Sequence, residues 1–180
     1  MLFKTLALAL LAVGLVQGET IYDHVEEHAD EDLATLLAAL EATKGIPNTD
    51  ESLQAILDNP DAGKYTLFAP IDTAFADVPV DDLLCNDANK AILADILNYH
   101  VVPPLDGDLH PLTNPVPTEL AGETLEVVKG ADGVPMTVNG ADVDPDPEHS
   151  PQDLENGAIW EINKVLLPPT FSLDALTACG

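Results

Sequence analysis

The chain has 180 residues, of which 32 are acidic and six are lysine, with no arginine, so its formal net charge is −26. Such a surface repels phosphate backbones and anionic lipid, which excludes nucleic acid and acidic membrane surfaces as expected partners. This length predicts a single domain, and a hydrophobic content of 46% excludes a largely disordered chain.

Residues 1–18 have the composition of a secretory signal peptide. Lys4 supplies a short positive segment, and the apolar run over 6–16 is eleven residues long, too short to span a bilayer. A membrane anchor is the alternative, although no stop-transfer pattern follows. We expect removal of this leader, which takes the formal charge to −27, and a secreted, extracellular protein without membrane insertion.

The first part of the mature chain has the apolar spacing of amphipathic helices. Thr20 is expected to cap a helix over about 21–29, and Asp30 to cap a second helix. Asp50 is expected to cap a third, shorter one. Each helix needs a surface on which to bury its apolar face.

Residues 65–75, YTLFAPIDTAF, predict a strand followed by a tight turn. The run is apolar at successive positions, as in a strand that is buried on both faces. Pro70 lacks an amide hydrogen and should end the pairing. Asp72 is expected to cap a single helical turn that returns Phe75 to the core.

A loop is expected next, and after it a helix capped by Asp87 that leads directly into Tyr99-His100. Later segments indicate short strands, with a tight hairpin at Asn139-Gly140 because this dipeptide suits a type I′ turn. The expected strands are 117–120, 124–128, 136–138, 141–143 and 158–167. Helices followed by short strands predict the α+β class.

Three stretches resemble signature motifs of the fasciclin domain family. The first, T-h-F-A-P-T-[ND]-x-A-F with h apolar, is matched at nine of ten positions over 66–75, with Ile71 replacing Thr. The second is Tyr99-His100 after a helix. The third, N-G-x-[IV]-H-x-[IV]-[DN]-x-V-L-x-P, is matched over 156–168 except at Trp160, which replaces His and is expected to pack.

The resemblance implies a compact fasciclin-like domain over 19–170 with a tail at 171–180. Its short antiparallel strands would form two small sheets, as a wedge or sandwich, with the N-terminal helices packed against them. It also implies a non-catalytic cell-adhesion or matrix or wall interaction module without a cofactor, whose partner is a cell-surface or extracellular matrix component. Tyr99 and His100 correspond to a stretch linked to receptor contact, and a purely structural role for both is the alternative.

Cys85 and Cys179 are the two cysteines of the chain. In an oxidising compartment an even pair suggests a disulfide, here between the tail and the middle of the domain. Two free or intermolecular thiols are the alternative.

Two patterns raise the possibility of metal binding. His24, Glu27 and His28 form an H-x-x-E-H pattern, which in a zinc-dependent hydrolase supplies two ligands and a base. A packed helix face or an isolated surface zinc site are its alternatives.

The second pattern starts as a calcium loop does, with acidic residues at alternate positions from Asp142. Ser150 and Asp153 occupy the ninth and twelfth places, but Pro147 stands where such a loop needs Gly. An acidic, Ca²⁺-responsive matrix protein is therefore the alternative function, with weak Ca²⁺ binding. A solvated acidic loop is the simpler interpretation.

Overall fold

The computed structural model describes residues 18–46, 53–105, 114–131, 133–146, 150 and 153–179. The expected leader, apart from Gly18, lies outside the described residues, and so does the expected cap Asp50. The elements in chain order are α1 Ile21–Glu27, the 3₁₀ helix η1 His28–Asp30, α2 Ala34–Ala42, α3 Leu53–Leu57, β1 Tyr65–Pro70, the 3₁₀ helix η2 Asp72–Asp77, α4 Val80–Leu84, α5 Asp87–Tyr99, β2 Val101–Val102, β3 Val116–Pro117, β4 Thr124–Leu125, β5 Val127–Lys129, β6 Pro135–Val138, β7 Ala141–Asp142, β8 Gly157–Ile162 and the 3₁₀ helix η3 Leu173–Ala175.

The predicted α+β class is confirmed. Among the described residues the strands form three small sheets, β2-β1-β8, β3-β4 and β5-β6-β7. Most neighbours are antiparallel, but β1 and β8 run parallel, from Tyr65 opposite Gly157 to Pro70 opposite Ile162. A parallel pair needs a long crossover, and nearly half of the chain lies between these two strands.

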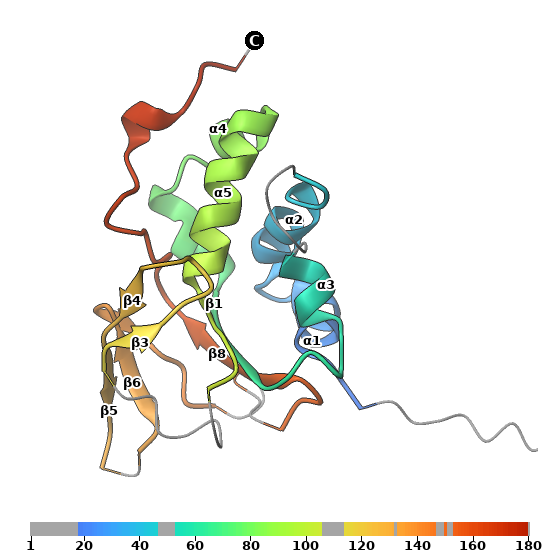
Figure 1. Cartoon of the computed structure of the whole chain (residues 1–180), viewed down its shortest axis with the longest axis vertical. Coiled ribbons are helices and arrows are strands. Elements are labelled where there is room, and N and C mark those ends of the chain that lie inside the picture. Colours follow the sequence, from blue (N-terminus) through green and yellow to red (C-terminus); the bar gives the residue numbers. More distant parts are fainter. Residues whose placement is uncertain are drawn as a thin grey trace, which may run out of the picture.

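The strand β1 is buried on both faces, as its apolar run predicted. Leu67 of β1 and Ile159 of β8 face a core built mainly from the helices. Phe68 and Trp160, their neighbours in sequence, face a second core formed with the small sheets. Alternate residues of the two strands therefore contribute to the two cores. Figure 1 shows α1, α2 and α3 on one side of the β1–β8 pair and β3 to β6 on the other side.

The start of α2 differs from the prediction. Asp30 lies in η1, and α2 begins at Ala34 without a side-chain cap from its own N-cap residue. Instead, Asp72 Oδ1 accepts a hydrogen bond of 2.7 Å from the backbone N–H of Thr35. Asp72 therefore caps α2 and does not cap its own turn, because the start of α2 lies beside η2 and presents a free donor there.

Two further boundaries also differ. The expected loop after η2 contains the helix α4, whose Leu83 is fully buried. In α5 the cap is Asn86, whose side chain accepts from Asn89 N–H, and Asp87 is the first helical residue. The hairpin prediction is confirmed, since Asn139 and Gly140 between β6 and β7 both have positive φ, 45° and 77°.

Candidate interaction site

Tyr99 and His100 lie where α5 ends and the chain enters β2, an edge strand of the central sheet β2-β1-β8. Both side chains are buried, with 2% and 1% of their surface exposed. A partner that approaches the folded domain therefore meets the surface around these residues and not their rings.

The His100 imidazole connects α5 to the segment that follows β8. Its Nδ1 lies 2.7 Å from the carbonyl oxygen of Ile96, which can only accept, so Nδ1 carries the hydrogen. Its Nε2 then accepts a 2.8 Å hydrogen bond from the backbone N–H of Leu166. Burial lowers the pKa of His100 to about 4, and the neutral ring fits both contacts.

The Tyr99 hydroxyl joins α5 to two of the small sheets. It donates to the carbonyl oxygen of Thr124 at 3.1 Å and accepts from the side-chain amide of Asn139 at 2.9 Å. Burial raises the pKa of Tyr99. Asn139 in turn accepts a 2.8 Å hydrogen bond from the backbone N–H of Glu126, so the hydroxyl belongs to a continuous polar network.

A surface groove of about 520 Å³ opens over this hydroxyl. The residues that line it are Tyr99, Asn114, Pro115, Thr124, Leu125, Glu126, Asn139 and Pro169. Asn114 holds one wall in place, since its amide group makes two 2.8 Å hydrogen bonds with the backbone of Val127. The groove itself could not be predicted from the sequence, because its walls come from distant segments. Two of its residues had a sequence signal, Tyr99 in the second motif and Asn139 in the turn.

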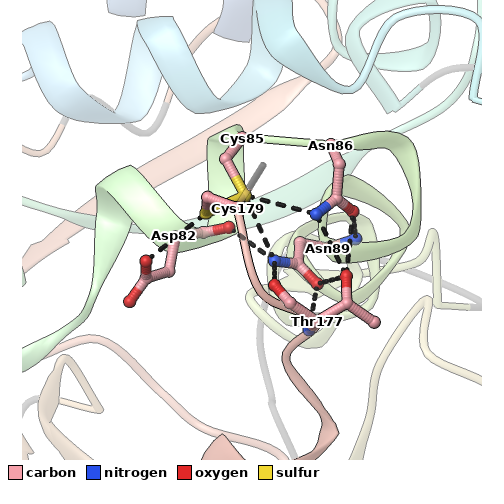
Figure 2. Close-up of a disulfide and its surroundings, with 6 residues drawn as sticks. All are labelled: Asp82, Cys85, Asn86, Asn89, Thr177 and Cys179. Atoms are coloured by element: carbon pink, nitrogen blue, oxygen red, sulfur yellow. Dashed lines mark hydrogen bonds between the residues drawn. A yellow bond between two sulfur atoms is a disulfide. The ribbon is translucent and has the colours of Figure 1, made fainter.

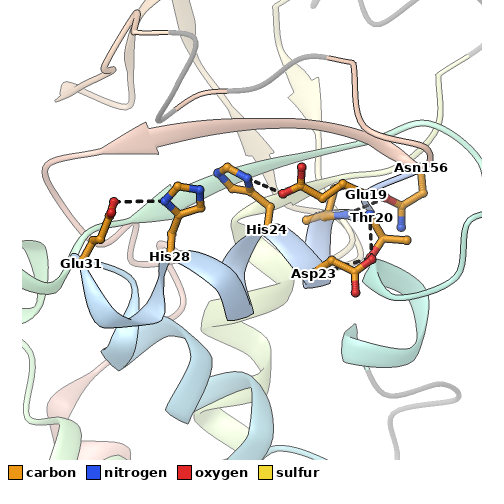
Figure 3. A network of polar contacts seen from close by, with 8 residues as sticks. Glu19, Thr20, Asp23, His24, His28, Glu31 and Asn156 are labelled. Carbon is orange, nitrogen blue, oxygen red and sulfur yellow. Dashed lines mark hydrogen bonds and ion pairs between the residues drawn. The ribbon is translucent and has the colours of Figure 1, made fainter. Parts of the chain in front are cut away.

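The two histidines of the H-x-x-E-H pattern are side by side, with ring centroids 4.2 Å apart and a tilt of 36°. Figure 3 shows each ring held by a carboxylate on its outer side. His24 Nδ1 lies 2.8 Å from Glu19 Oε1, and His28 Nδ1 lies 3.1 Å from Glu31 Oε2. Burial lowers the pKa of His24. Across the described ranges no group of three or more histidine, cysteine or carboxylate side chains is arranged to hold a metal, so the third ligand of a zinc hydrolase is not found there.

The acidic segment with the calcium-loop pattern is held in place by Ser150. Its hydroxyl donates to the carbonyl oxygen of Asp144 at 2.8 Å and accepts from the backbone N–H of Glu161 at 3.0 Å. The residue is fully buried, so its hydroxyl holds the loop onto β8 and is not presented to an ion. Residues 147–149 and 151–152 lie outside the described ranges.

Cys85 at the end of α4 and Cys179 in the tail are joined by a disulfide, with Cα atoms 5.7 Å apart. Figure 2 shows how the tail beside the bridge is fixed by Thr177. The Thr177 backbone N–H donates to Asn89 Oδ1 at 2.8 Å, and its carbonyl oxygen accepts from Asn89 Nδ2 at 2.9 Å. The bridge is therefore accompanied by a local polar network that fixes the same segment.

The family model of the fasciclin domain matches residues 31–168. The chain belongs to the fasciclin domain family. The match covers all three motifs and the residues that line the groove around Tyr99 except Pro169, so the fold described above is that of a fasciclin domain.

Several curated proteins are similar to this fasciclin domain. Protein sll1483 of Synechocystis is 37% identical over 78% of this chain and 69% of its own length. Immunogenic protein MPB70 of Mycobacterium bovis is 32% identical over 77% of this chain and 64% of its own length. Human periostin is 30% identical over 84% of this chain but only 16% of its own length.

Among solved structures, a FAS1 domain pair from the insect cell adhesion molecule fasciclin I matches with a TM-score of 0.44 at 20% identity. That match covers 77% of this chain and 47% of the other. In the ranges that the structure describes, no helix has both the length and the apolar character needed to cross a bilayer.

Proposed function

We propose that this fasciclin domain is a secreted, non-catalytic module that binds a cell-surface or extracellular matrix or wall component. The observation that carries the proposal is the family match over residues 31–168, within which all three sequence motifs lie. The proposed mature domain comprises residues 19–170 with its tail at 171–180.

The binding face in this proposal is the groove over the Tyr99 hydroxyl. It combines open volume with polar groups whose positions are fixed, namely the Tyr99 hydroxyl and the side chains of Asn114 and Asn139. A preorganised polar groove costs little to order on binding, which suits a recognition surface. Tyr99 and His100 contribute by positioning this face, since both rings are buried.

The experiment measures retention of residues 19–180 on cells and matrix from the natural source, at physiological salt. Glu126→Lys places a positive, longer side chain at the exposed rim of the groove. Glu26→Lys makes the same charge change on an exposed position of α1, on the other side of the central sheet, and is the matched control. Tyr99→Phe keeps the ring and removes only the hydroxyl.

We expect the parent and Glu26→Lys to be retained and Glu126→Lys to wash off, with Tyr99→Phe reduced. Equal retention of both lysine variants would show that the partner binds to another face of the domain. Absence of parent retention would contradict the adhesion proposal itself. A second retention measurement, made with a chelator present, distinguishes metal-free adhesion from the Ca²⁺-responsive alternative. That alternative requires retention to be lost when Ca²⁺ is removed.

A further inference from the structure

The histidine pair at the junction of α1 and η1 is arranged in a way that packing alone does not explain. His24 and His28 are four residues apart, which places both rings on one face of the chain. Glu19 binds the Nδ1 atom of one ring and Glu31 binds that of the other. Figure 3 shows that the second nitrogen of each ring lies on the inner side, toward the other imidazole.

The carboxylates fix the form of each ring. An ionised carboxylate only accepts hydrogen bonds, so the Nδ1 atom that faces it carries the hydrogen. In the neutral ring the Nε2 atom is then left with a free lone pair. For His24 this atom is buried and has no hydrogen-bond partner, and it is the one buried side-chain nitrogen or oxygen in the described ranges of which this is true.

We propose that His24 Nε2 and His28 Nε2 together bind a late first-row divalent cation such as Zn²⁺, with water in the remaining positions. Imidazole nitrogen is a preferred ligand of these ions. A carboxylate that accepts from the other ring nitrogen is the usual support of a metal-binding histidine, and Glu19 and Glu31 provide it here. This site is separate from the proposed adhesion function and does not depend on it.

The geometry needs only a small adjustment. Two imidazole nitrogens at ordinary Zn–N distances and a tetrahedral angle are about 3.4 Å apart. The ring centroids of such a pair are about 5 Å apart. The two rings here, with centroids 4.2 Å apart, must therefore separate by about 1 Å to bind one ion. The His28 side chain is 24% exposed and its partner Glu31 is 63% exposed, so this half of the site can turn to meet an ion while His24 stays fixed.

The large acidic surface requires a specific test, because a net charge of −26 attracts any cation. We would titrate the untagged mature protein with Zn²⁺ in a background of millimolar Mg²⁺, which occupies weak carboxylate sites. Calorimetry gives affinity and stoichiometry, and the imidazole resonances in a nuclear magnetic resonance spectrum report which rings respond. His110 and His149 lie outside the described residues, so His110→Asn and His149→Asn are controls.

The expected result is one saturable site, with resonance shifts at His24 and His28. Replacing the partly exposed ligand in His28→Ala should weaken binding at least tenfold, and Glu31→Ala should weaken it about tenfold through loss of the supporting carboxylate. The two control variants should bind as the parent does. Circular dichroism verifies that His28→Ala is folded.

Three results would overturn the proposal: no saturable Zn²⁺ binding by the parent, unchanged affinity in His28→Ala, or resonance shifts confined to other histidines. Because His28→Ala leaves the buried His24 in place, loss of binding in this variant cannot be assigned to collapse of the α1 packing. Replacement with Cu²⁺ should strengthen the binding, as the order of affinities of divalent ions requires.

Discussion

The imidazole of His100 connects the end of α5 to Leu166, 66 positions later in the chain. Both ring nitrogens are used, one as a donor and one as an acceptor, so the ring has no vacant position for a second proton. Protonation would place a donor on Nε2 against the Leu166 N–H donor. The residue is thus a structural connection whose integrity depends on its charge state.

The free energy of unfolding should therefore depend on pH through His100. Its pKa is lowered to about 4 in the folded protein, against about 6.5 in the unfolded chain, so the unfolded state takes up the proton first. The contribution of neutral His100 to the free energy of unfolding is fully present above pH 6.5. It is lost as the pH falls from 6.5 to 4, and the total loss is about 3 kcal/mol. Denaturant unfolding at a series of pH values measures it.

The control is His100→Asn, which is less stable at neutral pH but lacks this titration. Over pH 6.5 to 5, where most carboxylates remain ionised, its unfolding free energy should fall less steeply than that of the parent. Parallel curves for the two proteins in this range would contradict the assignment.

Asn156 is a second residue with contacts in several segments. Its Oδ1 accepts from the backbone N–H of Ile21 at 2.8 Å, and its Nδ2 donates to the carbonyl oxygen of Leu57 at 2.6 Å. Asn156→Ala would leave both buried groups without this partner, so we expect a loss of about 2–4 kcal/mol in unfolding free energy. Urea denaturation measures the loss.

Asn163→Ala is the matched control for this prediction. Asn163 also belongs to the last motif and also makes two side-chain hydrogen bonds, but both are to the exposed residue Asp142. We expect its cost to be below about 1 kcal/mol, since water replaces the lost partners. Similar costs for the two variants would show that burial does not govern the difference.

Residue types and positions could be predicted better than residue roles. Trp160 was expected to pack, and its burial at 1% exposure confirms this. The sequence placed Tyr99 and His100 together at a helix end, but it could not show that Thr124, Asn139 and Leu166 would surround them. Those contacts come from segments whose positions are set by the fold and not by local spacing.

At the scale of elements, Asp72 provides the clearest test. Its carboxylate caps the first turn of α2 from a different part of the chain, so Asp72→Ala should lower the unfolding free energy by about 1 kcal/mol. Thermal or urea unfolding measures the change. Asp77→Ala, at the exposed end of the same 3₁₀ helix, removes the same charge without a cap and should be near neutral.

An equal effect of the two aspartate variants would mean that the loss of charge, and not the cap, is responsible. The same comparison explains why element boundaries were harder to predict than elements. Apolar periodicity located α1 and α5, a continuous apolar run located β1, and the Asn139-Gly140 dipeptide located the β6–β7 hairpin, because these patterns are local. The caps of α2 and η2 were predicted incorrectly, because the donor and the acceptor lie in different segments.

At the scale of the molecule, the Cys85–Cys179 bridge closes a loop with a sequence separation of 94. In the chain-entropy model a loop of this length contributes about 4–5 kcal/mol, and strain in the folded state reduces the gain. The double variant Cys85→Ser, Cys179→Ser should therefore unfold at a lower denaturant concentration than the parent. Its free energy of unfolding should be lower by up to the contribution of the closed loop. Urea denaturation under non-reducing conditions measures it.

Mass spectrometry of the unreduced parent should show Cys85 linked to Cys179, and two alkylatable thiols would contradict the bridge. The variant Thr177→Ala tests the contribution of the neighbouring contacts with the bridge intact. The loss of its hydroxyl contacts with Asn86 and Asn89 should cost less than removal of the disulfide. An unfolding free energy that is unchanged in the double serine variant would show that the polar network alone fixes the tail.

The overall class was predictable because helices and short strands follow one another in the sequence. The arrangement into three sheets, and the parallel pairing of β1 with β8, was not predictable in the same way. Alternation within a strand indicates which faces are buried, but it does not indicate which distant strand is the neighbour. The fasciclin resemblance indicated small antiparallel sheets with helices packed against them, but it indicated two sheets and not the third sheet or the parallel pair.

The pairing of β1 with β8 has a consequence for biosynthesis. The N-terminal end of the chain is made first, yet β1 lacks its parallel neighbour until residue 162 has emerged from the ribosome. Until then, the apolar faces of α1 to α3 are without the complete sheet on which they pack. Because this pairing joins distant parts of the chain, the fold has long-range contacts that form only late in synthesis. A nascent chain that stalls before β8 is therefore exposed to aggregation and to capture by chaperones.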